Sequence, residues 1–301
     1  MFTFVLAPEH ARLERLWLVG CGAMGGALLA RWLAAGLPAE RVTVVDPAPR
    51  GLPAGFRGRV LPDALAAFAE SPDPTTVVLG IKPQALGALA PGLGRLLGPG
   101  PLIVSMLAGI PTATLAGHFP GAPIVRMMPN LPARVGEGVT AWVQQGASEA
   151  DVAAAGWLMA AAGSVHELAD EAMFDAVTAL SGSGPAYLFR MIEALGAAGA
   201  AAGLPADLAD RLALETVAGA AALARASDVT PAELRRQVTS PGGTTEAGLA
   251  VLDGADALSA LVEGAVRAAA RRSAELSQPA PSPAPSPSSP PLAAVRKVAG
   301  G

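Results

Sequence analysis

The sequence is poor in the residues from which disulfides and metal centres are built. Its 301 residues contain one cysteine, Cys21, and three histidines, His10, His118 and His166, which lie far apart. A single cysteine cannot form an internal disulfide or a cysteine-rich metal site. None of the histidines has a His, Asp or Glu partner at ligand spacing on a common face. We therefore expect no metal.

Aromatic residues and net charge are also scarce. Aromatics make up 4% of the chain although 51% of its residues are hydrophobic, so the cores must be built from Ala, Leu and Val in closely approaching helices. The formal net charge is −4 and no basic stripe is present. This balance argues against nucleic acid as a partner.

Long uninterrupted apolar runs are absent as well. The longest charge-free run, Leu96 to Val125, contains Pro99, Pro101 and Pro111 together with several glycines. Such a run cannot form an uninterrupted membrane-spanning helix. The N-terminus also lacks the basic and then apolar segments of a secretion signal. We expect a cytoplasmic protein without a membrane partner.

The chain is long enough for two domains, and its pattern changes once, after Glu167. Up to that residue, strand-like apolar runs alternate with helical patterns, which predicts a parallel sheet with helices on both faces. From Met173 to Ser277 the pattern is helical throughout. We therefore expect an α/β fold, with a Rossmann-type doubly wound sheet over residues 16–168 and an all-α dimerisation domain over residues 169–278. Residues 1–15 show no clear period and form an expected N-terminal extension, and the Pro/Ser-rich tail, residues 279–301, is expected to be disordered.

The individual elements follow from this pattern. One helix, Ala186 to Ala202, is long and nearly uncharged, and such a helix is expected to be buried between subunits. The expected strands cover residues 16–19, 42–45, 76–79, 102–105, 124–127, 138–143 and 164–167. The expected helices follow the glycine turn up to residue 35 and cover residues 63–70, 84–97, 112–117, 149–162, 173–181, 186–202, 207–226, 231–237, 245–252 and 257–277.

A glycine-rich turn follows the first expected strand, with the sequence Gly20-Cys21-Gly22-Ala23-Met24-Gly25. In a unit of strand, GxGxxG and helix, the first glycine makes the tight turn and the second lets the backbone approach a pyrophosphate. The third lets the helix pack close to the strand. The arrangement favours a dinucleotide site, formed by Gly20, Gly22, Ala23, Met24 and Gly25, over a plain glycine turn.

The second expected strand ends at Asp46, which is 46 − 25 = 21 residues past the last glycine. This is near the spacing of about 20 expected for an acid that binds the ribose hydroxyls. A carboxylate at that place would repel the 2′-phosphate of NADPH, which predicts a modest preference for NADH. Arg50 could instead pair with that phosphate, so NADPH and NADH both stay candidate cofactors.

Three further loops are expected at the carboxyl ends of strands, where ligands bind in such sheets. Lys82 could contact a phosphate or be a solvated loop charge. The Asn130 amide could bond the nicotinamide carboxamide, or the residue could form a simple turn after its proline. The candidate cofactor-binding residues in these loops are Ile81, Lys82, Pro83, Ala108, Gly109 and Asn130.

The segment Ser240–Thr245 interrupts two Ala/Leu-rich helical patterns. Its glycines permit turn angles closed to other residues, and its threonines can cap the helix that follows, from Thr245 to about Leu252. Free amides at a helix N-terminus attract anions, so a substrate carboxylate is expected on the amides of Gly243, Thr244 and Thr245. The alternative is an ordinary turn between helices. The candidate substrate-binding residues are Ser240, Gly242, Gly243, Thr244 and Thr245.

With these segments in order, the chain closely resembles the pyrroline-5-carboxylate reductases from about residue 16 to about residue 276. The glycine turn is shared with every Rossmann enzyme, whereas the segments Ala179–Tyr187 and Ser240–Thr245 are specific; Ile81–Pro83 and Arg126–Asn130 also match. The resemblance implies NAD(P)H-dependent reduction of 1-pyrroline-5-carboxylate to L-proline, the last step of proline synthesis. It also implies that the substrate is held by Ser240, Gly243, Thr244 and Thr245. The helical domain is implied to form an intertwined homodimer, often assembled further into a decamer. Leu131 departs from the family, which often has Thr there.

The implied chemistry fits the residues present. Hydride transfer to a protonated cyclic imine needs no His or Glu general base, because the iminium is already electrophilic and the cofactor supplies the hydride. Thr245 is the expected catalytic residue, its hydroxyl approaching the ring nitrogen. One alternative is a related reductase acting on another imine or a 2-hydroxy acid, although Met173 to Ala226 lacks the lysine that a hydroxy-acid enzyme would be expected to supply. The other is a non-catalytic dinucleotide sensor, which has no need of a substrate loop.

Overall fold

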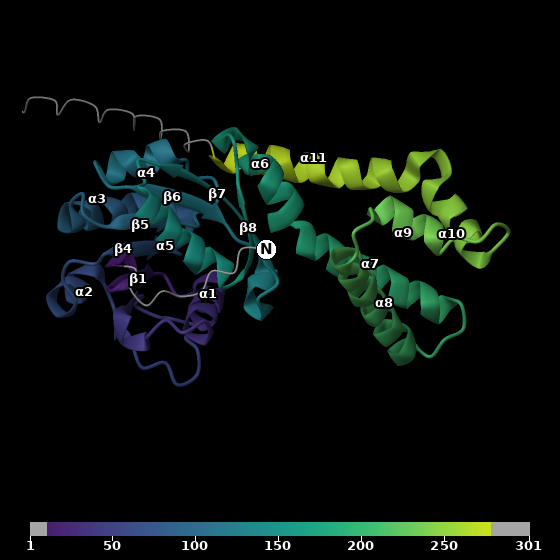
Figure 1. Ribbon diagram of the computed structural model, residues 1–301, viewed down its shortest axis with the longest axis horizontal. Helices are drawn as coiled ribbons and strands as arrows, with labels where there is room; N and C mark the ends of the chain where they lie inside the picture. Colours follow the sequence, from purple (N-terminus) through teal and green to yellow (C-terminus); the bar gives the residue numbers. More distant parts are fainter. Residues whose placement is uncertain (1–10, 278–301) are drawn as a thin grey trace, which may run out of the picture.

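The structure describes residues 11–277 and is a computed structural model of the chain, shown in Figure 1. These residues form a sheet domain with helices on both faces, followed by a domain built only of helices. The predicted α/β fold class is therefore confirmed. The tail predicted over residues 279–301 and residues 1–10 of the predicted extension lie outside the described residues. Between residues 11 and 277, no helix has the length and apolar character needed to cross a membrane.

The sheet has eight strands in the order β3-β2-β1-β4-β5-β6-β7-β8. Neighbouring strands run parallel except β6 and β7, which are antiparallel. The strand order reverses between β1 and β4, and dinucleotides bind at such a topological switch point. The strands are β1 (Leu16–Val19), β2 (Val42–Val45), β3 (Arg59–Leu61), β4 (Thr76–Leu79), β5 (Leu102–Ser105), β6 (Ile124–Met128), β7 (Gly138–Gln145) and β8 (Gly163–Glu167).

Two apolar layers hold helices against the two faces of the sheet. Because successive side chains of a strand point to opposite faces, Leu16 and Leu18 of β1 join one layer and Trp17 and Val19 join the other. The first layer packs against α1 and α5, and the second packs against α2, α3 and α4, so the predicted doubly wound arrangement is confirmed. These helices are α1 (Ala23–Ala34), α2 (Ala64–Glu70), α3 (Leu86–Leu97), α4 (Thr112–His118) and α5 (Glu149–Ala160).

The sheet differs from the prediction at two strands. The sequence does not predict β3, because its three residues, Arg59-Val60-Leu61, form a largely exposed strand at the edge of the sheet. The sheet is parallel as predicted except at β7, which pairs antiparallel with β6. Only residues 129–137 connect the two strands, and they include a 3₁₀ turn, Leu131–Val135, but no crossover helix. A parallel connection needs a dozen or more residues, so this short link imposes the antiparallel direction.

The predicted domain boundary at Leu16 is also too late. Ala11–Leu13 form a 3₁₀ turn, and Leu13 is only 1% exposed because it packs into the apolar layer of α1 and α5. The Arg12 carbonyl accepts a hydrogen bond from the Thr76 hydroxyl at 2.6 Å, and the Arg12 guanidinium lies 2.7 Å from the buried Asp151 carboxylate. Residues 11–15 therefore belong to the sheet domain, through tertiary contacts that a short charged segment does not reveal.

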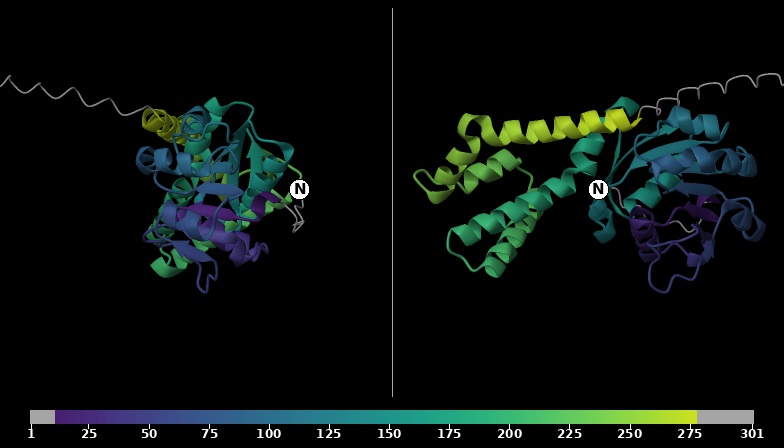
Figure 2. Two further views of the ribbon diagram at one scale, coloured as in Figure 1. Left: turned by 90° about the vertical axis from the view of Figure 1, so that its left-hand side faces the viewer. Right: turned by 180° about the vertical axis from the view of Figure 1, so that it is seen from behind.

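The helical domain extends away from the sheet domain as two arms (Figure 1). Helices α7 and α8 pack side by side in one arm, and α9 and α10 lie at the far end of the other. From there α11 runs back to the sheet domain, where its end packs against α6 (Figure 2). The helices are α6 (Phe174–Val177), α7 (Gly184–Ala201), α8 (Ala206–Ala226), α9 (Pro231–Gln237), α10 (Thr244–Asp253) and α11 (Ala257–Ser277).

The segment that joins the two domains is not the single helix predicted over residues 173–181. A 3₁₀ turn, Glu171–Met173, leads into the four residues of α6, and a π-helical turn, Thr178–Gly182, follows. The Ser183 N–H closes this turn by donating to the Thr178 carbonyl at 2.8 Å. Single π-helical turns occur frequently at functional sites, and the glycines of this segment favour a departure from regular helix.

Candidate active site

The glycine turn joins β1 to α1 at the carboxyl end of β1. Gly20 has a φ of +94°, and a side-chain carbon there would come 2.7 Å from the backbone of Gly80 and Ile81. A side chain at Gly25 would overlap the Gly20 carbonyl oxygen, whereas one at Gly22 would meet no atom within 4 Å. Open space therefore lies beside Gly22, at the N-terminus of α1. The tight turn, the close packing and the open side all suit a bound pyrophosphate.

Asp46 lies directly against this turn. Its Oδ2 accepts a hydrogen bond from the Cys21 N–H at 2.7 Å, and its Oδ1 accepts one from the Ala48 N–H at 2.8 Å. The Gly51 N–H donates to the Cys21 carbonyl at 2.9 Å, so the segment after β2 is tied to the glycine turn. Asp46 thus shapes the turn, a role that the sequence does not indicate. Each carboxylate oxygen keeps a lone pair that can accept from a ribose hydroxyl.

Cys21 and Arg50 lie on either side of Asp46 in the sequence and differ in their exposure. Burial raises the pKa of the Cys21 thiol, and the charge of the Asp46 carboxylate raises that pKa further, so the thiol stays protonated at neutral pH. Arg50, whose direction the sequence leaves open, is exposed in the segment after β2.

The other predicted cofactor loops share one edge of the sheet with the glycine turn. Because β2, β1, β4, β5 and β6 are parallel, the residues after them meet at their carboxyl ends. Lys82 is exposed there, while Gly109 is buried with a φ of +73°. A side-chain carbon at Gly109 would lie 3.2 Å from the Ser277 hydroxyl, so the end of α11 closes on this loop. The structure gathers at this edge Gly20, Gly22, Ala23, Met24, Gly25, Asp46, Ile81, Lys82, Pro83, Ala108, Gly109 and Asn130.

Asn130 is 7% exposed, and its side-chain amide is engaged by protein groups. Its Nδ2 donates to the Ser181 carbonyl at 3.1 Å and lies 3.3 Å from the Ser181 hydroxyl oxygen. Its Oδ1 accepts from the Val139 N–H at 2.9 Å. The amide therefore joins the end of β6 to the π-helical turn of the helical domain. The Asn130 side chain thus holds Ser181 of the helical domain at one end and the Val139 N–H of β7 (Gly138–Gln145) at the other, so in this arrangement both ends of the amide are used in contacts within the protein.

A second contact between the domains centres on Glu171. Arg126, which is 6% exposed, donates from Nη1 to Glu171 Oε1 at 2.7 Å, and its guanidinium lies 4.0 Å from the centre of the Phe174 ring. Thr112 donates to the same carboxylate from its N–H at 2.8 Å and from its hydroxyl at 2.7 Å. These bonds fix the first residues of the helical domain on β6 and α4.

The Glu171 carboxyl is held in its charged form. Burial by itself would raise the pKa of Glu171, but the hydrogen bonds from Arg126 and Thr112 and the charge of Arg126 outweigh that effect and lower the pKa below its ordinary value. The sequence does not indicate a role for Glu171, and it points to Ser181 only as a member of the segment Ala179–Tyr187. The arginine within the otherwise apolar run of β6 is a signal that could have pointed to a buried acidic partner.

The predicted substrate loop lies between α9 and α10. Gly242 has a φ of +72° and its N–H donates to Glu246 Oε2 at 2.7 Å, while the Gly243 N–H donates to the Ser240 carbonyl at 3.0 Å. The helix begins at Thr244, and Gly243 is the capping residue, with no side-chain capping bond. The predicted capping by threonine is therefore wrong, and the Gly243 amide expected to hold a carboxylate is engaged in the turn.

Thr244 and Thr245 are exposed and occupy the first two helical positions. The N–H groups of the first turn of a helix have no partner within it. The amides and hydroxyls of both threonines therefore face solvent, and they can form further hydrogen bonds.

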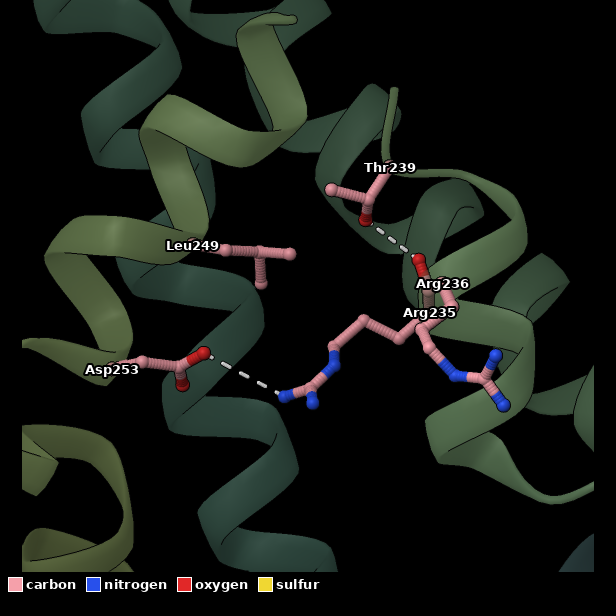
Figure 3. A pocket seen from close by; sticks show the side chains of 5 residues that line it. All are labelled: Arg235, Arg236, Thr239, Leu249 and Asp253. Carbon is pink, nitrogen blue, oxygen red and sulfur yellow. Dashed lines mark hydrogen bonds and ion pairs between the residues drawn. The ribbon is translucent and has the colours of Figure 1, made fainter. Parts of the chain in front are cut away.

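A hollow of about 430 Å³ lies behind the loop, between α9 and α10 (Figure 3). It is lined by Arg235, Arg236, Thr239, Leu249 and Asp253. Arg235 points to Asp253, with their charged atoms 3.6 Å apart, and the Thr239 hydroxyl donates to the Arg235 carbonyl at 2.6 Å. Arg236 pairs with Glu233. Both arginines of the hollow are therefore paired with carboxylates.

The substrate loop lies at the far end of the helical arm from the cofactor edge, with the length of α11 between them. Figure 1 shows α10 at one end of the longest dimension of the molecule and β1, β4 and β5 toward the other, and the reverse view in Figure 2 agrees. The structure therefore brings together the predicted cofactor residues, and separately the predicted substrate residues, but does not join the two sets within one chain.

Two family models match the chain. One, described as pyrroline-5-carboxylate reductase dimerisation, matches residues 171–276, and the other, described as NADP oxidoreductase coenzyme F420-dependent, matches residues 15–109. The pyrroline-5-carboxylate reductase of Pseudomonas aeruginosa is 43% identical over 257 residues, which cover 84% of this chain and 93% of that protein. The pyrroline-5-carboxylate reductase of a Synechocystis species is 43% identical over 264 residues, covering 84% and 95%.

Solved structures of pyrroline-5-carboxylate reductases are also similar to this chain. A pyrroline-5-carboxylate reductase from Coxiella burnetii has a TM-score of 0.81 at 30% identity and covers 89% of this chain and 100% of that chain. The pyrroline carboxylate reductase of Plasmodium falciparum, solved with NADP bound, has a TM-score of 0.77 at 27% identity and covers 88% and 98%.

Proposed function

Because the chain belongs to the pyrroline-5-carboxylate reductase family, we propose how its residues perform that family's reaction. The chain is an oxidoreductase of proline biosynthesis that reduces 1-pyrroline-5-carboxylate to L-proline with NADPH or NADH. One observation carries this function: curated relatives of that activity match the chain over nearly their whole length, across both the sheet domain and the helical domain.

The cofactor is assigned to the carboxyl edge of the sheet. The open side of Gly22 and the N-terminus of α1 fit a pyrophosphate, and Asp46 fits the adenosine ribose. The loops at Ile81–Pro83 and Ala108–Gly109 would border the other half of the molecule, beyond the switch point between β1 and β4. When bound, the reduced cofactor supplies the hydride.

The substrate is assigned to the loop before α10. The amides of Thr244 and Thr245 point out of a helix N-terminus, a place that favours a carboxylate. A protonated ring nitrogen is a hydrogen-bond donor, and the Thr245 hydroxyl oxygen can accept from it. Ser240 and Gly243 contribute by closing the turn, and Gly242 contributes the left-handed backbone that the turn requires. These residues orient the substrate, and the reaction asks for no general base.

Each complete site is proposed to combine two copies of the chain. The substrate loop of one copy cannot serve the cofactor edge of the same copy, because α10 lies at the far end of α11 from the sheet domain (Figure 1). The description of residues 171–276 as a dimerisation region supports assembly through the helical arms. The apolar side chains that these arms expose, among them Leu188 at 57% and Phe189 at 53%, are the surface that a second copy would cover.

A direct assay tests the function. Purified protein is mixed with NADH or NADPH and with 1-pyrroline-5-carboxylate, with a 2-oxo acid or with no added substrate, and cofactor oxidation is followed. Oxidation with the imine alone, and formation of proline, is the expected result. Faster oxidation with the 2-oxo acid, or binding of cofactor without turnover of either substrate, would overturn the assignment in favour of a hydroxy-acid reductase or a dinucleotide sensor.

Three finer points belong to the same proposal. Light scattering at micromolar concentration is expected to give at least a homodimer, and the same measurement would reveal a decamer.

The boundary between the two domains is proposed at residues 168–169, just before the 3₁₀ turn Glu171–Met173, and limited proteolysis would test it. A cytoplasmic location is proposed and would be tested by cell fractionation.

A further inference from the structure

We propose that Ser181 donates a hydrogen bond to the nicotinamide carboxamide of the bound cofactor, and that Asn130 positions Ser181 for this role. The inference rests on the proposed cofactor site at the carboxyl edge of the sheet. It assigns to Ser181 the contact that was one of the two roles considered for the Asn130 amide.

The π-helical turn Thr178–Gly182 meets the carboxyl end of β6. Gly182 approaches so closely that a side-chain carbon there would lie 3.1 Å from the Met128 methyl group. Asn130, two residues past Met128, donates to the Ser181 carbonyl at 3.1 Å. The helical domain therefore places Ser181 at the edge where the strand ends converge, although 51 residues separate it from Asn130.

The position along this edge selects the nicotinamide half of the cofactor. In a doubly wound sheet the dinucleotide lies across the switch point, with one half over each set of strands. Asp46, at the end of β2, marks the adenosine half on one side. The end of β6 lies on the other side, beyond β4 and β5, which is the side left for the nicotinamide.

The hydrogen bonds leave the Ser181 hydroxyl ready to donate. A hydroxyl has one proton and two lone pairs, and the Asn130 amide approaches the oxygen at 3.3 Å as a donor, so it uses a lone pair. Within residues 11–277 the hydroxyl donates to no protein group, and Ser181 is only half-buried. Its proton is thus free for an acceptor that enters from the edge, and the carboxamide oxygen is such an acceptor.

Binding of two related ligands tests the proposal without turnover. NADH contains the nicotinamide, whereas ADP-ribose keeps the adenosine and pyrophosphate and lacks it. Ser181→Ala is expected to weaken NADH binding about fivefold, the effect of one hydrogen bond, and to leave ADP-ribose binding unchanged. Ser181→Thr, which keeps the hydroxyl, is expected to retain the wild-type ratio of the two affinities. Titration calorimetry measures both.

Asn130→Asp tests the positioning role. The aspartate keeps an acceptor for the Val139 N–H but cannot donate to Ser181 when ionised. It is expected to lose the same part of the NADH affinity as Ser181→Ala, and the double variant is expected to lose no more than either single one. Equal weakening of NADH and ADP-ribose by either substitution would overturn the proposal, because a general distortion of the domains affects both ligands.

Ser183→Ala is the matched control, since its hydroxyl lies in the same segment without a bond from Asn130. It is expected to leave both affinities unchanged, and a loss of NADH affinity equal to that of Ser181→Ala would overturn the assigned role of Ser181. Wild-type protein that binds neither ligand would instead overturn the proposed cofactor site. Wild-type binding of both ligands with no effect of Ser181→Ala would overturn this inference alone.

Discussion

The two domains bury their apolar side chains very differently. In the sheet domain, large side chains such as Trp17 and Trp32 are completely buried, and the exposed large hydrophobic residues among its described residues are Val60, Leu65, Leu131 and Val135. Between residues 184 and 277, the buried hydrophobic residues are the small Ala209 and Ala213, while the arms expose large apolar side chains on α7, α8, α10 and α11.

This difference shows which domain buries its own large apolar side chains within one chain. Burying one Leu or Phe side chain stabilises a protein by about 1.5–3 kcal/mol, and the sheet domain obtains this stabilisation from its own two apolar layers. The arms of one chain leave those side chains exposed to solvent, and in the proposed assembly a second copy supplies the missing contacts. The domain proposed to need a partner for its core is also the one that carries the proposed substrate loop.

The largest effect on assembly and activity is expected from charged substitutions on the exposed apolar side chains of α7. Leu188→Glu combined with Phe189→Glu places two charges on side chains that are 57% and 53% exposed in one chain. We expect a monomer by light scattering and a loss of kcat/KM of about a hundredfold or more, some 2.7 kcal/mol, because each site needs a second copy. Cofactor binding is expected to persist.

Leu65→Glu is the control for this variant, since Leu65 is 74% exposed on α2 of the sheet domain. It is expected to leave assembly and activity unchanged. Full activity of the doubly substituted protein as a monomer would contradict the shared site.

A smaller effect is expected at the substrate loop itself. Thr245→Ala is expected to lower kcat/KM for the imine by about tenfold, the 1.4 kcal/mol of one hydrogen bond, with cofactor affinity unchanged. The reason is its hydroxyl at the second position of α10, beside free amides. Steady-state kinetics measure the effect. Thr114→Ala, at an exposed position of α4, is the control, and equal turnover by wild type and Thr245→Ala would remove Thr245 from the site.

The preference between the two cofactors tests the sheet domain. We expect a modest preference for NADH, because the Asp46 carboxylate repels a 2′-phosphate. Asp46→Asn removes this charge and keeps one acceptor for the turn amides, so it is expected to shift the ratio of kcat/KM values several-fold toward NADPH. Arg50→Ala is expected to shift the ratio the opposite way. A wild type that favours NADPH by more than about tenfold would show that a basic group outweighs Asp46.

The smallest effect is expected where the domains meet. Glu171→Gln removes the charge that Arg126 and Thr112 stabilise. We expect the free energy of unfolding to fall by only about 1 kcal/mol, because the Glu171 side chain is 28% exposed and solvent screens its charge. Since the native pKa is lowered, this stability is fully present above the unfolded pKa of about 4.3 and is lost as the pH falls through the lower native pKa.

Thermal melts of wild type and Glu171→Gln between neutral pH and pH 3 measure this contribution. The two melting temperatures are expected to differ at neutral pH and to converge below the native pKa. A constant difference at every pH would contradict a role for the ionised carboxylate.

Most of the secondary structure, and the glycine turn of the cofactor site, can be predicted from local sequence patterns. The apolar runs of β1 and β2, the glycines between β1 and α1, and the change to helical periodicity after Glu167 are each readable within a few residues. They predict correctly because strand, tight turn and amphipathic helix depend on near neighbours. β3 is not predicted for the same reason, because a short exposed strand at the edge of the sheet has no apolar run that a local pattern could detect.

The sequence by itself determined the family, the α/β architecture and the residues available for cofactor and substrate. Only the tertiary structure decided that the Asn130 amide holds Ser181, that Asp46 anchors the glycine turn, and that Thr245 lies far from the cofactor edge of its own chain. The physical reason is separation along the chain. Hydrogen bonds between residues dozens of positions apart, and the direction in which a helical arm leaves a sheet, depend on packing that no local pattern encodes.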